Sequence, residues 1–501
     1  MNIPQTETAN QKLLRSKLFW VGILYFAEGF PLGVFYDVFP VHFRTLGVEL
    51  WKIGFMSLLG LSWTLKFLWA PAIDHFRRHR RWMFAADMVM ALIMVVFAYQ
   101  NGFGAWVWWL IGLFTIMSAT NDVAIDGYTI EMLNKGELGV ANGLRIGFYR
   151  VGMLASGFVL MLADVWGWTG TYLTAALLFL VTGVCCLLAP REMNKPGSGS
   201  LSIGHELKAL VQRPAAAGSV ILFLIGALWL ADRSVKWSDD TNLFWPTVFL
   251  VSATFLLGVW LFSHNFRRRA VAAEQPTSLT EGPMFGTLLS MLRRPHIVAV
   301  VVFVLTFKLG DSAMGFMIKP FWVDAGFSAA QIGLVSVNIG LGLSIAGGIA
   351  GGWYTDRVGI FRALWVLGLW QAFSNLGYAY AANTVPLAEE GYALDAADHW
   401  LMYAASAIES FTGGLGTAAF LAFLMAIVNK QHAATEYAIL SSIFALSRSL
   451  AGWAGGFGAH SMGYADYFLL TFFLAFPAYL LLPWAKRMMQ FAEQQKTFGQ
   501  H

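Results

Sequence analysis

The sequence contains few charged residues and almost no cysteine. Lys, Arg, Asp and Glu make up 12% of its 501 residues, about half of the share that is usual in a soluble domain. The two cysteines, Cys185 and Cys186, are adjacent in an apolar stretch, which argues against a disulfide framework, and the ten histidines show no metal-ligand spacing. The net charge of +4 comes from positive residues in short loops, so it does not indicate nucleic-acid binding. We therefore expect no cofactor and no metal.

Hydrophobic residues, in contrast, are abundant and form long runs. They make up 57% of the chain, and a membrane-spanning helix needs about 20 of them in sequence. We predict an all-α integral membrane protein with two six-helix bundles and two extra central helices, about 14 transmembrane helices in all. The predicted core spans are 19–40, 51–72, 82–100, 104–125, 141–163, 168–189, 296–318, 330–352, 362–381, 401–428, 437–459 and 465–485, and the extra spans are 215–231 and 243–263.

These spans divide the chain into five predicted segments. The N-terminal bundle occupies 1–190, and the C-terminal bundle with its tail occupies 296–501. Between them lie a cytoplasmic connection (191–214), the two extra helices (215–263) and a cytoplasmic linker (264–295). The polar start of the chain precedes an apolar stretch that is too long for the core of a signal peptide, so we expect a retained helix there.

The two predicted bundles carry the same pattern of helix-breaking and charged residues. In each half, proline, glycine and charged residues recur in the same order around the second span, around the fifth span and in the spans next to them. The repeated residues are Pro40, Gly47, Ile53 and Gly54 against Pro320, Gly326, Ile332 and Gly333, Asp74 against Asp356 and Arg357, and Arg150 against Arg448. Internal repeats of this kind are typical of secondary transporters, whose two halves rock around a central binding site.

The positive residues indicate how the chain is oriented in the membrane. If the spans alternate, the basic clusters in 77–81 and 267–269 fall on one side, together with the basic residues that flank the first and last spans. The opposite side carries the stretch 382–399, which has four acidic residues and no Lys or Arg. Because cytoplasmic loops are enriched in Lys and Arg, both termini are predicted to be cytoplasmic.

Several short motifs resemble the AmpG muropeptide permease family of the major facilitator superfamily. They lie at 66–71 with Asp74, 121–126, 308–311, 361–364, 374–378, 413–420, 429–430 and 434–435. In the second motif, Asn121 stands where the family has Gln, and the run from Asp122 to Gly127 is also similar to acetyl-CoA transporters. The two extra central helices differ from family members, which tend to carry additional helices at the C-terminus.

The resemblance implies a function and a location. Its implied substrate is GlcNAc-anhydro-MurNAc, with or without attached peptide, imported from periplasm to cytoplasm in peptidoglycan recycling by proton symport. The implied setting is the bacterial inner membrane, as a multi-pass protein. The expected partners are therefore the small-molecule anhydro-muropeptide, protons and the lipid bilayer, and we expect a monomer.

Acidic residues inside the predicted spans are candidates for proton coupling. A charged group at the membrane centre costs about 2.5–3.5 kcal/mol on insertion scales, so each one needs a reason. Gly29 and Pro31 weaken the helix beside Glu28 and predict a bend there. The alternative role for each acid is a structural salt bridge or an interhelical hydrogen bond. The candidates are Glu28, Asp311, Glu409 and the pair Asp122 and Asp126, which shares a helical face and is placed to organise a gate with Arg145 or Arg150.

Cations and amides inside the spans are candidates for substrate binding. An arginine is always charged, so within the membrane it needs an anion or water. The cations could bind a substrate carboxylate, or they could pair with structural acids, as Lys308 could with Asp311 one turn away. The amides could bind sugar hydroxyls and acetamides, although helix–helix hydrogen bonding is the commoner use. The candidates are Lys308, Arg150, Arg448, Asn338, Gln371 and Asn375.

The turn after the second helix of each half is predicted to act as a conformational gate. Asp74 with Arg77, and Asp356 with Arg357, occupy these turns. Such pairs are expected to bridge neighbouring helices on the cytoplasmic side and to stabilise the outward-open state. We do not expect them to bind substrate.

Other functions are open at this point. The same transporter class could carry a siderophore, a peptide or an acyl-CoA-like solute. An integral-membrane enzyme would need a nucleophile, a metal cluster or a catalytic acid pair at a membrane face, and the sequence offers none that is convincing. A signalling receptor is opposed by the intact repeats and the paired intramembrane charges. We therefore expect a secondary active transporter and not an enzyme.

Overall fold

The computed structural model describes residues 16–66, 69–70, 73, 78–100, 102–133, 138–191, 291, 294, 296–390, 393–428 and 433–498. These residues are almost entirely helical and contain no strand. The predicted extra spans at 215–231 and 243–263, the connection 191–214 after its first residue, almost all of the linker 264–295, and the predicted gate residues Asp74 and Arg77 lie outside the described residues.

The N-terminal group of helices follows the predicted spans closely. Gly47 ends the first helix in a turn with φ of 75°, a conformation that favours glycine. The first helix contains Pro31 and passes through a π-helical segment. The elements are α2 (Lys17–Gly33), η1 (Val34–Val38), α3 (Phe39–Thr45), α4 (Leu50–Leu59), α5 (Leu61–Leu65), α7 (His79–Ala98), α8 (Ala105–Met132), α9 (Leu138–Met161) and α10 (Ala163–Leu188).

The C-terminal group repeats this plan. Its first helix also contains a proline, Pro320, and also leads to a glycine turn, where Gly326 has φ of 86°. The elements are α16 (Ile297–Thr306), α17 (Leu309–Asp324), α18 (Ala329–Gln331), η4 (Ile332–Ile339), α19 (Gly340–Val358), α20 (Ile360–Thr384), η5 (Ala388–Glu390), α21 (Ala396–Ile427), α22 (Ala433–Leu474) and α23 (Phe476–Phe498).

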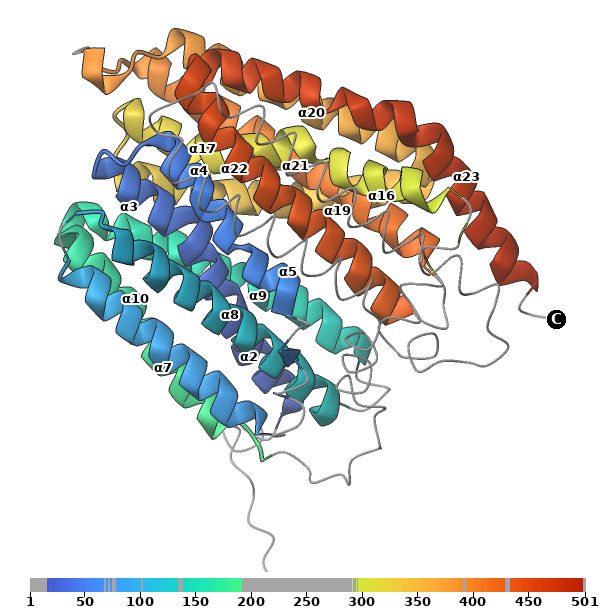
Figure 1. Ribbon diagram of the computed structural model, residues 1–501, viewed down its shortest axis with the longest axis horizontal. Helices are drawn as coiled ribbons and strands as arrows, with labels where there is room; N and C mark the ends of the chain where they lie inside the picture. The colour runs from blue at the N-terminus through green and yellow to red at the C-terminus, as the bar shows by residue number, and fades with distance from the viewer. Residues whose placement is uncertain are drawn as a thin grey trace, which may run out of the picture. The chain divides into compact units, whose positions relative to one another are not determined.

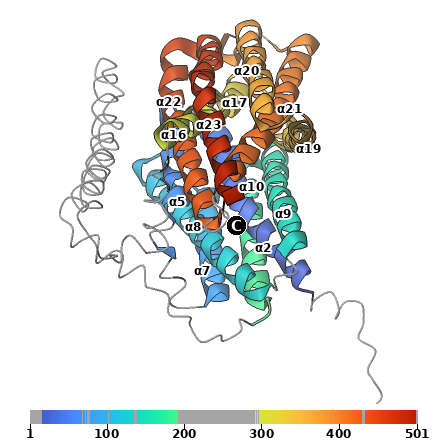
Figure 2. The same cartoon turned by 90° about the vertical axis from the view of Figure 1, so that its right-hand side faces the viewer.

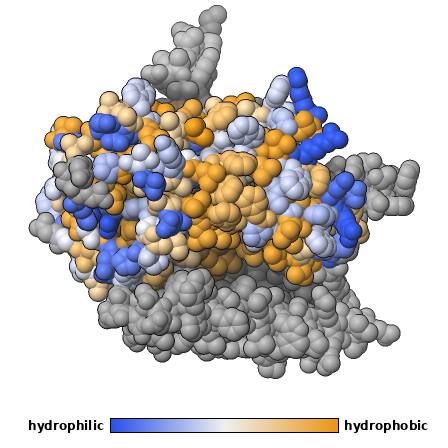
Figure 3. Space-filling view, turned by 90° about the horizontal axis from the view of Figure 1, so that it is seen from above, coloured by the Kyte–Doolittle hydropathy of each residue, from blue (hydrophilic) through white to orange (hydrophobic). Residues whose placement is uncertain are grey.

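Nine helical stretches of the described residues are long and apolar enough to cross a membrane. The last of them, Ile439–Phe491, passes through a sharp break at Gly463 and so covers two predicted spans. The second predicted span is shorter in the described residues and ends at Leu65. Apolar side chains cover the middle of the face drawn in Figure 3, as expected for contact with lipid acyl chains.

Glycines allow the helices of each bundle to approach closely. A Cβ atom on Gly29 of α2 would lie 2.0 Å from the carbonyl oxygen of Tyr149 on α9. In the second bundle, a Cβ atom on Gly347 of α19 would lie 2.0 Å from the carbonyl oxygen of Phe411 on α21. Both distances are shorter than van der Waals contact, so only glycine fits, which explains the abundance of glycine in these helices.

The two bundles contact each other near the end that carries the Gly47 and Gly326 turns. Gly54 of α4 meets Gly456 of α22, where a Cβ on Gly54 would lie 2.6 Å from the Gly456 Cα. Gly333 of η4 packs in the same way on the carbonyl oxygen of Gly157. Figures 1 and 2 show the helices α2–α10 and α16–α23 as two groups, with α3 and α4 beside α17. The bundles are therefore closed at this end, which we call the turn end.

Polar contacts reinforce this closure. Arg44 at the end of α3 forms an ion pair with Asp324 at the end of α17, and the Tyr464 hydroxyl donates to the same carboxylate at 2.6 Å. Asp164 at the start of α10 accepts a hydrogen bond of 2.9 Å from the backbone N–H of Ala330. The Arg44–Asp324 and Ala330–Asp164 contacts join the N-terminal bundle to the C-terminal one, so opening the turn end must break both of them.

Candidate functional site

A cluster of five charged side chains lies inside the N-terminal bundle. Glu28 on α2 is 6% exposed, and its Oε2 atom has no hydrogen-bond partner. Asp126 on α8 accepts a hydrogen bond of 3.0 Å from the Tyr25 hydroxyl and forms an ion pair of 3.1 Å with Arg145 on α9. Lys66, which follows α5, lies 3.5 Å from Asp122. We call these five groups, Glu28, Asp122, Asp126, Lys66 and Arg145, the N-terminal charge cluster.

The charges of this cluster do not balance. It holds three acids, and Lys66 and Arg145 are the cations that act on Glu28 among the described residues. Three carboxylates against two cations leave one negative charge, and Glu28 is the acid without an ion-pair partner. An uncompensated buried carboxylate is costly, and Glu28 is the acid of the cluster whose negative charge is least compensated by the described residues. Arg145, and not Arg150, is the arginine that the structure brings to Asp126.

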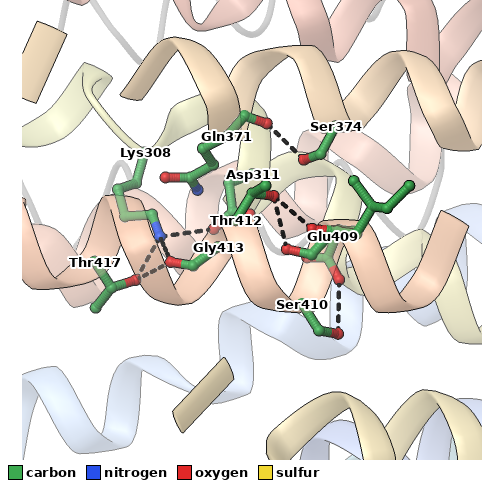
Figure 4. Close-up of polar contacts among 10 residues, drawn as sticks. Lys308, Asp311, Gln371, Ser374, Glu409, Ser410, Thr412, Gly413 and Thr417 are labelled. Atoms are coloured by element: carbon green, nitrogen blue, oxygen red, sulfur yellow. Dashed lines mark hydrogen bonds and ion pairs between the residues drawn. The ribbon is translucent and has the colours of Figure 1, made fainter. Parts of the chain in front are cut away.

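Lys308 and Asp311 lie together in the C-terminal bundle, as their spacing predicts. Lys308 stands at a short break between α16 and α17, and its ammonium lies 3.1 Å from the Asp311 carboxylate. The same ammonium donates to the Thr417 hydroxyl at 2.7 Å and to the Gly413 carbonyl oxygen at 3.3 Å, both on α21. Figure 4 shows the three oxygen partners around the lysine. The lysine is thus held by two helices.

Glu409 lies on α21, the helix that carries Gly413 and Thr417, one turn from Gly413. The Ser410 hydroxyl donates to its carboxylate at 3.2 Å (Figure 4). A Cβ atom on Gly413 would lie 3.8 Å from both Asp311 Oδ1 and Glu409 Oε1, so the two acids face the same small space. Among neighbouring charges, those of Asp311 and Lys319 act most strongly on Glu409.

The structure adds an ion pair that the sequence analysis missed. Lys319 on α17 lies 3.2 Å from Asp37 on η1, so this pair joins the two bundles inside the membrane region. Asp37 also accepts a long hydrogen bond, 3.5 Å, from the Ser156 hydroxyl of α9. The signal that could have revealed the pair is position, because Lys319 directly precedes Pro320 and Asp37 lies three residues before Pro40, the equivalent proline of the repeat.

Arg150 and Arg448, which the repeat pairs, have no ion pair with any of the described residues. The Arg448 guanidinium lies 4.1 Å from the centre of the Tyr36 ring, on the facing bundle. The two arginines are close enough for the charge of Arg448 to act on Arg150. Two cations from different bundles thus lie close together without a carboxylate partner among the described residues.

The three predicted amides occupy different surroundings. Asn375 donates to the Thr471 hydroxyl at 3.2 Å, which links α20 to α22. Gln371 is buried beside Gly416, and its amide nitrogen has no hydrogen-bond partner. Both amide atoms of Asn338 also lack partners, and Asn338 packs on Gly157 of the other bundle. Gln371 and Asn338 therefore have hydrogen-bonding capacity to offer a ligand.

The gate residues that the structure describes lie far from the turn end of their helix. Asp356 and Arg357 are exposed near the end of α19, and the Arg357 guanidinium lies 4.1 Å from the centre of the Trp353 ring. Neither residue has an ion pair with the described part of the chain.

A second acid that the sequence analysis missed is Asp87 on α7, which is fully buried and accepts a hydrogen bond of 3.0 Å from the Asn121 amide.

Comparisons with known proteins identify the class. No family model matches the sequence. The chain is similar to the anhydromuropeptide permease of Escherichia coli K12, with 26% identity over 95% of this chain and 81% of the relative. It is also similar to a transporter named AmpG 4 in Rickettsia conorii, with 23% identity over 93% of this chain and 95% of the relative.

Among solved structures, the fold resembles that of the POT family transporter PepTSo, with a TM-score of 0.65, 14% identity, and coverage of 96% of this chain and 98% of that one. The protein is a multi-pass membrane transporter with the major facilitator fold, and not an enzyme. Within this class it resembles the AmpG-type permeases along nearly its whole length, which confirms the resemblance that the motifs indicated.

Proposed function

We propose that this protein imports anhydro-muropeptides, GlcNAc-anhydro-MurNAc with or without peptide, from periplasm to cytoplasm by proton symport. The names of its relatives support the substrate class. The observation that carries the proposal is the pair Arg150 and Arg448, which comes from both bundles and has no ion pair with the described residues. An anion bound between them would hold the two bundles together, as a transported solute does at the repeat interface.

The chemistry of an anhydro-muropeptide suits this site. Its peptide carries carboxylates, which match the geometry of a guanidinium group. Its sugars carry hydroxyl and acetamide groups, which are partners for the unsatisfied amides of Gln371 and Asn338. Lys308 is already held by Asp311 and two oxygen atoms of α21, so it would contact substrate only if Asp311 released it.

Proton coupling is supported by the charge imbalance in the N-terminal charge cluster. Glu28 is buried, has an oxygen without a hydrogen-bond partner and lies among more acids than cations. A protonated Glu28 would remove the excess negative charge. Asp122, Asp126, Asp311 and Glu409 are further coupling candidates, but each has a hydrogen-bond or ion-pair partner in this state.

The orientation of the chain in the membrane indicates which side the closed turn end faces. The positive-inside rule places both termini in the cytoplasm of a bacterium with an inner membrane. The turn end then faces the periplasm. Because the bundles are closed at the turn end, the state described here would be the one that is closed to the periplasm. The exposed Asp356 and Arg357 would lie on the cytoplasmic side, where a gate is disengaged in such a state.

The test is uptake of labelled GlcNAc-anhydro-MurNAc-tripeptide into proteoliposomes, with and without an inward proton gradient. We expect saturable uptake that the gradient increases. Arg150→Gln and Arg448→Gln should each weaken apparent substrate affinity by about ten- to a hundredfold, because a hydrogen bond to a charged group contributes about 1.5–3 kcal/mol. Lys486→Gln, which removes an exposed cation at the end of the fold, is the matched control and should behave like the unmodified protein.

Two outcomes would contradict the proposal. Absence of uptake by a protein that is monodisperse and helical would mean that the fold carries another cargo, and binding of peptides, siderophores and acyl-CoA would be measured next. Normal affinity in both arginine variants would remove the arginines from the substrate site, even if uptake itself is observed.

A further inference from the structure

One lysine in the membrane region forms an ion pair with an acid of the other bundle and acts electrostatically on an acid of its own bundle. Lys319 is 19% exposed and pairs with Asp37 of the N-terminal bundle, which is 8% exposed. Its charge also acts on Glu409, which belongs to the C-terminal bundle like Lys319 itself. In this state Lys308 pairs with Asp311 and Lys319 pairs with Asp37, whereas Glu409 has no ion pair with the described residues.

We propose that Lys319 is an exchangeable counter-ion that controls closure of the turn end. When this end is closed, Lys319 pairs with Asp37 across the bundles. When it opens, Asp37 moves away with its bundle, and Lys319 turns to Glu409 within its own bundle. The charge on Glu409 therefore sets how easily the bundles separate. Leaving Asp37 costs Lys319 less free energy when an ionised Glu409 is present as its new partner.

The groups that face this exchange come from several helices. Asp37 is contacted by Lys319 and by the Ser156 hydroxyl of α9. Glu409 is contacted by the Ser410 hydroxyl. The charges of Asp311 and Lys308 act on Glu409, and the charge of Glu409 acts on Tyr378. Lys308 is held by Asp311 and by two oxygen atoms of α21, so Lys319 is the lysine that remains to exchange.

The chain provides a matched control on the same two helical spans. Arg44 and Asp324 also join the first span to α17 at the turn end. The further charged or polar groups that act on Arg44 are Tyr464 and Glu389, and Glu409 is not among them. This pair is therefore a simple latch, whose removal should favour opening without any dependence on Glu409.

The experiment measures closure and needs no substrate, so it succeeds or fails independently of the proposed cargo. Spin labels are placed at exposed Ala105 and Ala397, at the turn ends of α8 and α21, after Cys185 and Cys186 are replaced by Ser. Distance distributions between the two labels are then recorded by double electron–electron resonance in lipid nanodiscs. Asp37→Asn and Asp324→Asn should each raise the ratio of open to closed molecules on the order of fivefold, the lower range of measured couplings between sites.

Glu409→Gln distinguishes an exchangeable counter-ion from a simple latch. We expect it to lower the open-to-closed ratio by a similar factor, about fivefold, because Lys319 then has no acid to move to. In the Lys319→Gln background, Glu409→Gln should have no further effect. In the Asp324→Asn background it should retain its full effect. An unchanged ratio in Glu409→Gln, or an equal effect with and without Lys319, would overturn the proposal.

Discussion

The two bundles share a backbone plan but place their charges differently. Each begins with a helix that contains a proline and ends in a glycine turn, and each relies on glycine for its closest helix contacts. The N-terminal charge cluster, however, lies within one bundle, with Glu28 near the middle of its span. The charges of the C-terminal bundle reach across to Asp37 through Lys319. The repeat therefore conserves packing, whereas the chemistry of the two halves has diverged.

The shared packing should be the most sensitive feature to mutation. Gly347→Val would place side-chain atoms where the Phe411 carbonyl oxygen lies, and Gly29→Val would do the same at Tyr149. We expect both variants to yield no folded protein, since the backbones cannot separate without losing the bundle. Gly348→Ala is the control, because a Cβ atom there meets no atom within 4 Å. Recovery of monodisperse protein by size-exclusion chromatography checks this, and a well-folded Gly347→Val would show that the close approach is not needed.

The difference in charge placement should have the second-largest effect, which is an effect on transport. If the N-terminal charge cluster holds the coupled proton, Glu28→Gln should abolish gradient-driven accumulation while substrate exchange across the membrane continues. The reason is that a neutral side chain mimics the protonated acid and cannot release a proton. Accumulation and exchange are compared in the same proteoliposomes, with Asp466→Asn, which neutralises an exposed carboxylate, as a control for the loss of a carboxylate. Normal accumulation by Glu28→Gln would end the assignment of coupling to this cluster.

The lysines of the two halves should differ in their effect on stability. Lys308→Met removes an ammonium that is 5% exposed and leaves Asp311 without its ion pair, so we expect a loss of about 1.5–3 kcal/mol in the free energy of unfolding. Lys66→Met removes a lysine that is 31% exposed and lies 3.5 Å from its acid, and should cost less. Thermal unfolding in detergent ranks the two variants, and an equal loss in both would remove this distinction between the halves.

The smallest effect is expected at the loop of the turn end. Glu49 pairs with Lys52 at 2.6 Å, and the Lys52 hydrogen bond lowers the pKa of the Glu49 carboxyl. A lowered pKa means that the pair stabilises the fold above the unfolded pKa, about 4.3, and that this contribution disappears as the pH falls through the folded value. Because both side chains are exposed, Glu49→Gln should cost at most about 1 kcal/mol at pH 7 and less at pH 3. A loss that is equal at both pH values would contradict this.

Many residues of the candidate site could be selected from the sequence, for a physical reason. Glu28, Asp122, Asp126, Lys308, Asp311 and Glu409 were identified because an ionisable residue in an apolar span is conspicuous. The pairing of Lys308 with Asp311 followed from their spacing along one helix. Asp37 and Lys319 were missed because they lie close to the ends of predicted spans, where a charge can reach water and needs no partner.

The sequence by itself determined the helices, the repeat and the class of protein. These depend on the length and order of apolar runs and on where glycine and proline interrupt them, which are local properties of the chain. The tertiary structure alone decided that Lys319 meets Asp37, that Arg145 meets Asp126, and that the bundles are closed at the turn end. Such contacts join residues from different helices, and they exist only where tertiary packing brings those helices together, so no local pattern encodes them.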